Sequence, residues 1–150
     1  MIRQFKFEDE VHQNLGCVPM AVRRKLDRIG LKLGLEQWRQ LSQGERLAVC
    51  HLPVDSAEEQ DAARVFIREA VQERSGEVVK ELPAQLRSAA TPPGSPPPTL
   101  IIHARTAGIA LGQAEWECLD EDERYALIKL GGSELPSHNL VAALHEFLQE

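Results

Sequence analysis

The sequence lacks the features of a membrane, secreted or nucleic-acid-binding protein. It contains no run of 18 apolar residues, and its first ten residues, MIRQFKFEDE, hold no apolar stretch like that of a signal peptide. Acidic residues outnumber basic ones by 23 to 17, and the net charge of -6 argues against general affinity for nucleic acid or anionic membranes. We therefore expect a cytoplasmic protein that binds neither nucleic acid nor membrane.

Cysteine is scarce and widely spaced. Cys17, Cys50 and Cys118 are an odd number and form no Cys-x-x-Cys pair, which favours free thiols in a reducing compartment. Gly-rich phosphate loops, G-x-S-x-G, H-E-x-x-H and paired-carboxylate signatures are also missing. We therefore expect no catalytic residues, no bound metal and no cofactor.

Leucine and alanine dominate what is present. Together they number 35, against 20 for valine, isoleucine and threonine combined, and this balance favours helix over strand. The chain of 150 residues is long enough for one domain with a real core. The composition predicts an all-α fold.

Two parts of the chain are similar at a shift of 78 positions. GLKLGLEQWRQLSQGERLAVCHL, from Gly30, aligns with GIALGQAEWECLDEDERYALIKL, from Gly108, and nine pairs are identical. The pairs include both tryptophans, Trp38 and Trp116, whose equivalent places favour a role in the core. We interpret the chain as a compact multi-helix domain built from two pseudo-repeated helical units.

Local signals give the helix boundaries of the first unit. Pro19 suits the opening turn of a helix, and Gly30 suits its left-handed end. Ser42 with Glu45 forms a capping box before a helix from about Gln43 to His51, and Ser56 with Glu59 forms the next. In the second unit Asp120 with Glu123 repeats the box, and the repeat predicts that TLIIHA is helical rather than a strand.

The proline-rich run TPPGSPPP divides the chain. We predict a single helical domain over 1–150. Its parts are repeat unit one (17–75), a connecting helix (77–90) broken near Pro83, a Pro-rich linker (91–98) and repeat unit two (99–150).

Basic residues gather on the first predicted helix, although the whole chain is acidic. Residues 1–40 hold eight basic and five acidic residues. A solvated helix face and a docking surface for an acidic partner or an anionic cofactor both explain this cluster. The candidate partner-binding residues are Cys17, Met20, Arg23, Lys25, Arg28 and Lys32.

Cys17 stands at the start of that helix, where the helix dipole and free N–H groups favour thiolate. A thiol-based redox sensor or enzyme centred on Cys17 is therefore an alternative. His12 is the nearest base in the sequence. The competing interpretation is a small apolar residue at a helix start.

The sequence resembles the nitrate reductase-associated protein family at both ends. The first end has the pattern Phe-x-Phe-Glu, then Cys-Val-Pro-Met, then Val-Arg-x-Lys-Leu-Asp and Gly-Leu-Lys-Leu ahead of a tryptophan. The matching residues are Phe5, Phe7, Glu8, Cys17–Met20, Val22, Arg23, Lys25–Asp27, Gly30–Leu33 and Trp38. At the other end the matches are Arg124–Leu130, Asn139 and Ala143–Phe147.

The resemblance implies a context rather than a mechanism. Family members are associated with assimilatory nitrate reductase and with molybdenum-cofactor genes, and no catalytic residues carry over. It implies a non-catalytic accessory protein whose partner is nitrate reductase or a molybdopterin biosynthesis protein. A direct binder of an anionic pterin cofactor is a further alternative, and the sequence leaves homo-oligomerisation open.

Overall fold

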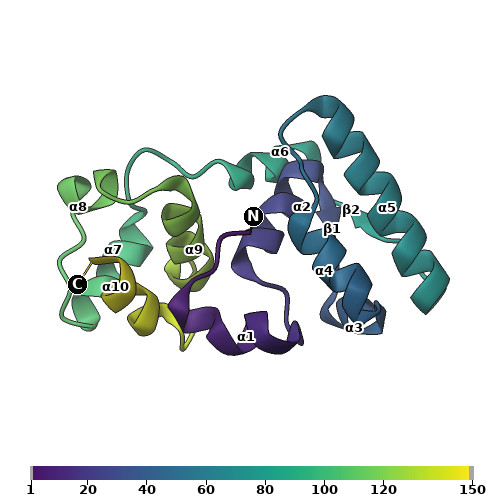
Figure 1. Ribbon diagram of the computed structural model, residues 1–150. Coiled ribbons are helices and arrows are strands. Elements are labelled where there is room, and N and C mark those ends of the chain that lie inside the picture. Colours follow the sequence, from purple (N-terminus) through teal and green to yellow (C-terminus); the bar gives the residue numbers. More distant parts are fainter. Residues whose placement is uncertain (1, 149–150) are drawn as a thin grey trace. The chain divides into compact units, whose positions relative to one another are not determined.

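The computed structural model describes residues 2–148, apart from the side chains of residues 84 and 85, and it is mostly helical (Figure 1). Helices hold 63% of the residues and strands 3%. The prediction of an all-α fold is confirmed in that the chain is mostly helical. The exception is a pair of two-residue strands.

By its contacts the chain divides into two compact units, each considered by itself. Unit 1 comprises residues 2–4 and Glu8–Ala90, and unit 2 comprises Phe5–Phe7 and residues 91–148. The division after Ala90 coincides with the start of the predicted linker, while a single domain over 1–150 stays a prediction.

Short elements follow one another in both units. A 3-10 turn, η1 (Lys6–Glu8), precedes them. Unit 1 contains α1 (Asp9–Asn14), α2 (Met20–Ile29), β1 (Leu31–Lys32), α3 (Leu35–Gln40), α4 (Gln43–His51), α5 (Ala57–Ser75), β2 (Lys80–Glu81), α6 (Ala84–Arg87) and the 3-10 turn η2 (Ser88–Ala90). Unit 2 contains α7 (Pro98–Thr106), α8 (Gln113–Glu117), α9 (Glu121–Gly131) and α10 (Leu140–Leu148).

Helix α2 begins directly after Pro19, its N-cap residue, and ends at Gly30, which has a φ of 76°. Only glycine adopts that left-handed conformation without steric cost, so Gly30 stops the helix. The buried residues of its apolar face are Val22, Leu26 and Ile29. Their spacing of three to four positions is what places them on one side of the helix.

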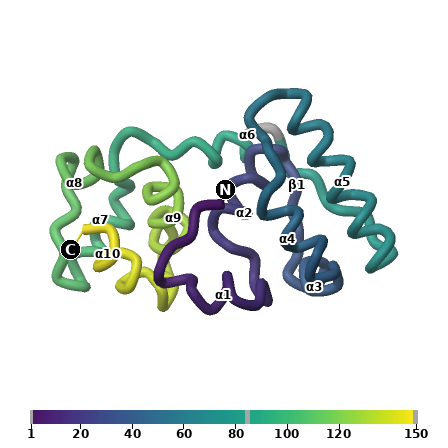
Figure 2. Tube along the Cα trace, in the orientation of Figure 1, coloured from purple at the N-terminus to yellow at the C-terminus, as the bar shows by residue number. Residues whose placement is uncertain are grey.

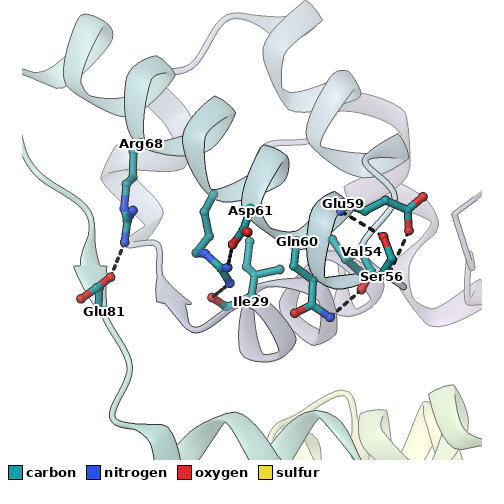
Figure 3. A network of polar contacts seen from close by, with 9 residues as sticks. Ile29, Val54, Ser56, Glu59, Gln60, Asp61, Arg68 and Glu81 are labelled. Carbon is teal, nitrogen blue, oxygen red and sulfur yellow. Dashed lines mark hydrogen bonds and ion pairs between the residues drawn. The ribbon is translucent and has the colours of Figure 1, made fainter.

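Two capping boxes fix the starts of α4 and α5, as predicted. The Ser42 hydroxyl accepts from the Glu45 N–H at 3.1 Å, and the Glu45 carboxylate accepts from the Ser42 N–H at 2.8 Å. Ser56 and Glu59 make the same pair of bonds before α5 (Figure 3). Each box satisfies two N–H groups that have no partner within the helix.

The two tryptophans are fully buried, one in each unit, as predicted. Trp38 donates from its Nε1 to the Leu15 carbonyl oxygen at 2.7 Å, and Trp116 donates from its Nε1 to the Pro93 carbonyl oxygen at 3.0 Å. A buried indole N–H needs such an acceptor. The second bond ties the proline-rich segment to α8, so this segment is anchored within unit 2.

The prediction of a connecting helix over 77–90 is wrong for its first half. Lys80–Glu81 is a strand that pairs antiparallel with Leu31–Lys32 (Figure 1), and a helix begins only after Pro83. Figure 2 traces the path of the chain through the labelled elements. Two features explain the difference: a residue before proline avoids helical geometry, and Val78 and Val79 are β-branched. Arg68 of α5 forms an ion pair with Glu81 and so ties the strand to that helix (Figure 3).

The core of unit 2 brings α9 against α7 and α10. Gly131, at the end of α9, allows the closest approach, because a Cβ there would lie 2.7 Å from Leu140 and 2.8 Å from Leu100. The segment TLIIHA is part of α7, and Leu100 and Ala104 are buried, so the helical interpretation is confirmed.

Candidate functional site

The predicted docking segment, Cys17 to Lys32, starts in a loop that unit 1 holds in place. Trp38 donates to the Leu15 carbonyl oxygen, and Arg39 donates from its Nε to the Gly16 carbonyl oxygen at 3.1 Å. Cys17 is exposed and lies three residues before the first helical residue, farther from the helix end than the sequence suggested. The loop therefore presents the Cys17 thiol to solvent.

Met20, the first residue of α2, is buried, with 4% of its surface exposed. Its backbone N–H donates to the Glu8 carboxylate at 2.8 Å. Met20 therefore packs inside unit 1 and is not available as a surface contact.

Lys25 also faces its own unit. Its Nζ donates to the carbonyl oxygen of Cys50, near the end of α4, and the side chain is partly buried. Burial lowers the pKa of Lys25, because the charged ammonium loses hydration, while Cys50 and Asp55 act in the opposite direction. Lys25 therefore holds α2 to α4 and is a poor candidate for contact with a partner.

Arg24 and Arg28, both on α2, have partners within unit 1. Arg24 donates from its Nε to the Ala90 carbonyl oxygen at 2.8 Å. Arg28 lies 3.5 Å from the Asp55 carboxylate, which is a long and solvent-exposed ion pair. Arg28 can leave Asp55 at little cost and therefore remains a candidate for partner binding.

Arg23 and Lys32 are the candidate cations that point away from the unit. Both are exposed, and within the described residues neither has a carboxylate partner. The strand pairing places Lys80 directly opposite Lys32, and Lys80 is also exposed and without an acidic partner in the described chain. Like charges directly opposite on paired strands repel each other, so this pair favours an approaching anion or carboxylate.

Lys80 is the member of this group that the sequence did not predict. Its place follows from the strand β2, in a segment predicted to be helical. Two features of the sequence could have indicated this strand. Val78 and Val79 are both β-branched, and Pro83 follows three residues after Lys80.

Glu8 and His12 form a buried polar pair in unit 1 that sequence reasoning also missed. Glu8 is 6% exposed, and the His12 Nε2 lies 3.7 Å from its Oε1. Burial lowers the pKa of His12, with a smaller opposing effect from Asp9. His12 therefore faces Glu8, within unit 1.

Phe5–Phe7 and the helix α10 meet within unit 2. The rings of Phe5 and Phe7 lie 5.1 Å and 6.1 Å from the ring of Phe147, and the Glu146 carboxylate accepts from the backbone N–H groups of Lys6 and Phe7. The contacts of the Phe-x-Phe-Glu pattern are therefore structural, because Phe5 and Phe7 pack on α10 while Glu8 binds Met20 in unit 1.

The other candidate groups add no site. Cys50 is buried, and burial raises the pKa of its thiol, whereas Cys118 is exposed on α8's C-terminal side. Within residues 2–148 no group of three histidines, cysteines or carboxylates is arranged to hold a metal ion. No helix in the described part of the chain is long and apolar enough to cross a membrane.

Comparison with known proteins gives one match. The family model described as conserved nitrate reductase-associated protein matches residues 4–147. Neither the curated proteins nor the solved structures compared with the chain include a match. Because the family match covers nearly the whole sequence, the chain belongs to the conserved nitrate reductase-associated protein family.

Proposed function

We propose that this protein is a non-catalytic accessory protein of nitrate assimilation in the cytoplasm. It docks on nitrate reductase, or on a partner that handles the molybdenum cofactor, and supports its assembly or activity. Membership of the family supplies the link to nitrate reductase. The observation that carries the docking proposal is the set of exposed cations Arg23, Lys32 and Lys80, which we call the basic patch. Lys32 and Lys80 lie side by side on paired strands, and Arg23 lies in the first half of α2.

The partner's surface is acidic in this proposal. Lys32 and Lys80 repel each other across the strand pair, and a carboxylate beside them removes this repulsion. Rim charges of this kind act mainly on association rate and selectivity, so binding weakens as salt is added. Lys25 and Met20 position the segment from inside and take no direct part.

The experiment is co-purification from nitrate-grown cells. The variant R23E/K32E/K80E is expected to lose the reductase, and its charge-conserving control R23K/K32R/K80R is expected to retain it. Circular dichroism verifies that both are folded. A folded charge-reversed variant that still recovers the reductase in the normal amount would refute docking through the basic patch.

Two alternatives need other measurements. A redox sensor or enzyme centred on Cys17 requires this thiol to react differently from Cys118, which is also exposed. Equal alkylation rates of the two thiols over a pH series would remove that alternative. Equilibrium dialysis with labelled pterin cofactor tests direct cofactor binding.

We also propose that the two units contain a duplicated helical element. In support, the Nε atoms of Arg46 and Arg124 donate to the carbonyl oxygens of Trp38 and Trp116 at 3.1 Å and 3.0 Å. Each partner is displaced by 78 positions, as in the aligned sequences. Replacing residues 112–124 by the sequence of 34–46 is expected to leave cooperative unfolding intact, whereas a scrambled insert is not. Failure of the first chimera to fold would count against duplication.

A further inference from the structure

Unit 2 carries an open surface hollow at the end of α7. Its volume is about 610 Å³, and its lining comes from Ile101 and Arg105 of α7 and from the segment Gly108–Gly112 that follows. Ile109 and Leu111 are buried, whereas Gly108 and Ala110 are exposed. The alternation is that of an extended segment with one face packed on unit 2 and the other face exposed.

The corresponding face of unit 1 is covered by the chain itself. There the helix α2 ends at Gly30, as α7 ends before Gly108, and the two glycines have φ values of 76° and 81°. The strand β2 pairs with the residues that follow Gly30, and the Leu82 N–H donates to the Gly30 carbonyl oxygen at 2.8 Å. The Arg87 side chain lies over Gly30 so closely that a Cβ would collide with its guanidinium group.

No such cover lies over the face of unit 2 within the described residues. A Cβ added to Gly108 would meet no atom within 4 Å, and no described backbone N–H donates to its carbonyl oxygen. Arg24 of unit 1 donates a hydrogen bond to the Ala90 carbonyl oxygen, whereas Ile102, the residue that aligns with it in unit 2, is 58% exposed. The same local geometry is therefore occupied in one unit and open in the other.

We infer that this face of unit 2 binds an extended segment of a partner protein. The segment adds as a short antiparallel strand along Gly108–Ala110, as Lys80–Leu82 does along Gly30–Lys32. An apolar side chain takes the place that the buried Val79 has in unit 1. Residues 79–90 of a second copy are already used within its own unit 1, so this segment of a second copy is not the occupant.

Charge specifies the occupant further. The sequence alignment places Arg105 where unit 1 has Asp27, so the charge beside the glycine is reversed. Arg105 is exposed, and its guanidinium group has no carboxylate partner in the described chain. The segment over unit 1 carries Arg87 at this end, and the occupant of unit 2 carries a carboxylate there instead.

The test uses the full chain and synthetic peptides with the sequence of residues 77–90. The R87E peptide is expected to shift the amide NMR signals of Gly108, Ile109 and Ala110 saturably, and to bind about two- to five-fold more tightly than the peptide with Arg87. In the protein variant R105E this preference is expected to invert. A peptide that carries L82P as well as R87E lacks the strand-forming N–H and is the matched control.

Three results would overturn the inference. The first is the absence of saturable shifts at Gly108–Ala110, and the second is a preference that does not change in R105E. The third is self-association of the protein that R105E abolishes, which would make a second copy the occupant. None of these results bears on the basic patch, so this inference and the proposed function fail separately.

Discussion

Replacement of Glu8 by alanine tests the hydrogen bond that joins the Phe-x-Phe-Glu pattern, which ends at Glu8, to the Cys-Val-Pro-Met pattern, which ends at Met20. The Glu8 carboxylate is almost fully buried and accepts the N–H of Met20, the first residue of α2, at 2.8 Å. A hydrogen bond to a charged group contributes about 1.5–3 kcal/mol, and E8A also leaves a buried N–H without an acceptor. We therefore expect E8A to lower the free energy of unfolding of unit 1 by about 2–3 kcal/mol.

The variant E8Q separates the hydrogen bond from the charge. Its amide oxygen still accepts the Met20 N–H, so E8Q removes the charge of the carboxylate, which faces the positive end of the helix dipole and lies beside His12. We expect E8Q to cost about 1 kcal/mol.

The assay is urea unfolding followed by tryptophan fluorescence. Each unit contains one buried tryptophan, so a W116F background leaves Trp38 as the reporter of unit 1, and a W38F background leaves Trp116 for unit 2. An E8A cost below about 0.5 kcal/mol in the Trp38 signal would refute the role of Glu8 as the acceptor that holds the start of α2.

Three further variants follow from the structure. G131A is expected to cost about 1–2 kcal/mol in urea unfolding of unit 2, because its Cβ enters the space of Leu140 and Leu100. G44A in α4 is expected to be neutral or stabilising, because a Cβ there lies 4.0 Å from the Ser42 hydroxyl, an ordinary contact distance. His12 has a lowered pKa in the folded state, so its contribution to stability is present above the unfolded pKa of about 6.5 and is lost as the pH falls below that value. The urea midpoint of the unsubstituted protein is therefore expected to fall between about pH 7.5 and pH 5.5, and H12Q is expected to make this fall smaller. K25M is expected to lower the free energy of unfolding by about 1 kcal/mol, because it loses the hydrogen bond to the Cys50 carbonyl oxygen. K32M, at an exposed site, is expected to lower it by less than about 0.5 kcal/mol. Equal effects of the two substitutions would contradict the structural role of Lys25.

The parts of the fold that sequence could predict are those decided locally. The capping boxes before α4 and α5 involve residues three positions apart, and the left-handed turn at Gly30 depends on one residue type. Both are visible without any long-range contact. The buried tryptophans were predictable for a different reason, because the internal similarity placed them at equivalent positions.

The parts that sequence could not predict depend on contacts between distant residues. The role of Lys25 is decided by a carbonyl group 25 residues away, and that of Glu8 by an N–H 12 residues away. On a helical wheel Lys25 is one more cation on a polar face, and nothing local distinguishes it from Arg23. The strand β2 likewise exists only because Leu31–Lys32 offers a backbone edge, and Lys80 joins the basic patch through that pairing.

The most direct test of the central claim is the affinity of the purified protein for purified nitrate reductase, measured against salt concentration. We expect binding that weakens steadily with added salt, that R23E/K32E/K80E abolishes, and that R23K/K32R/K80R preserves. Binding that is unaffected by salt and equal for the two variants would contradict docking through the basic patch.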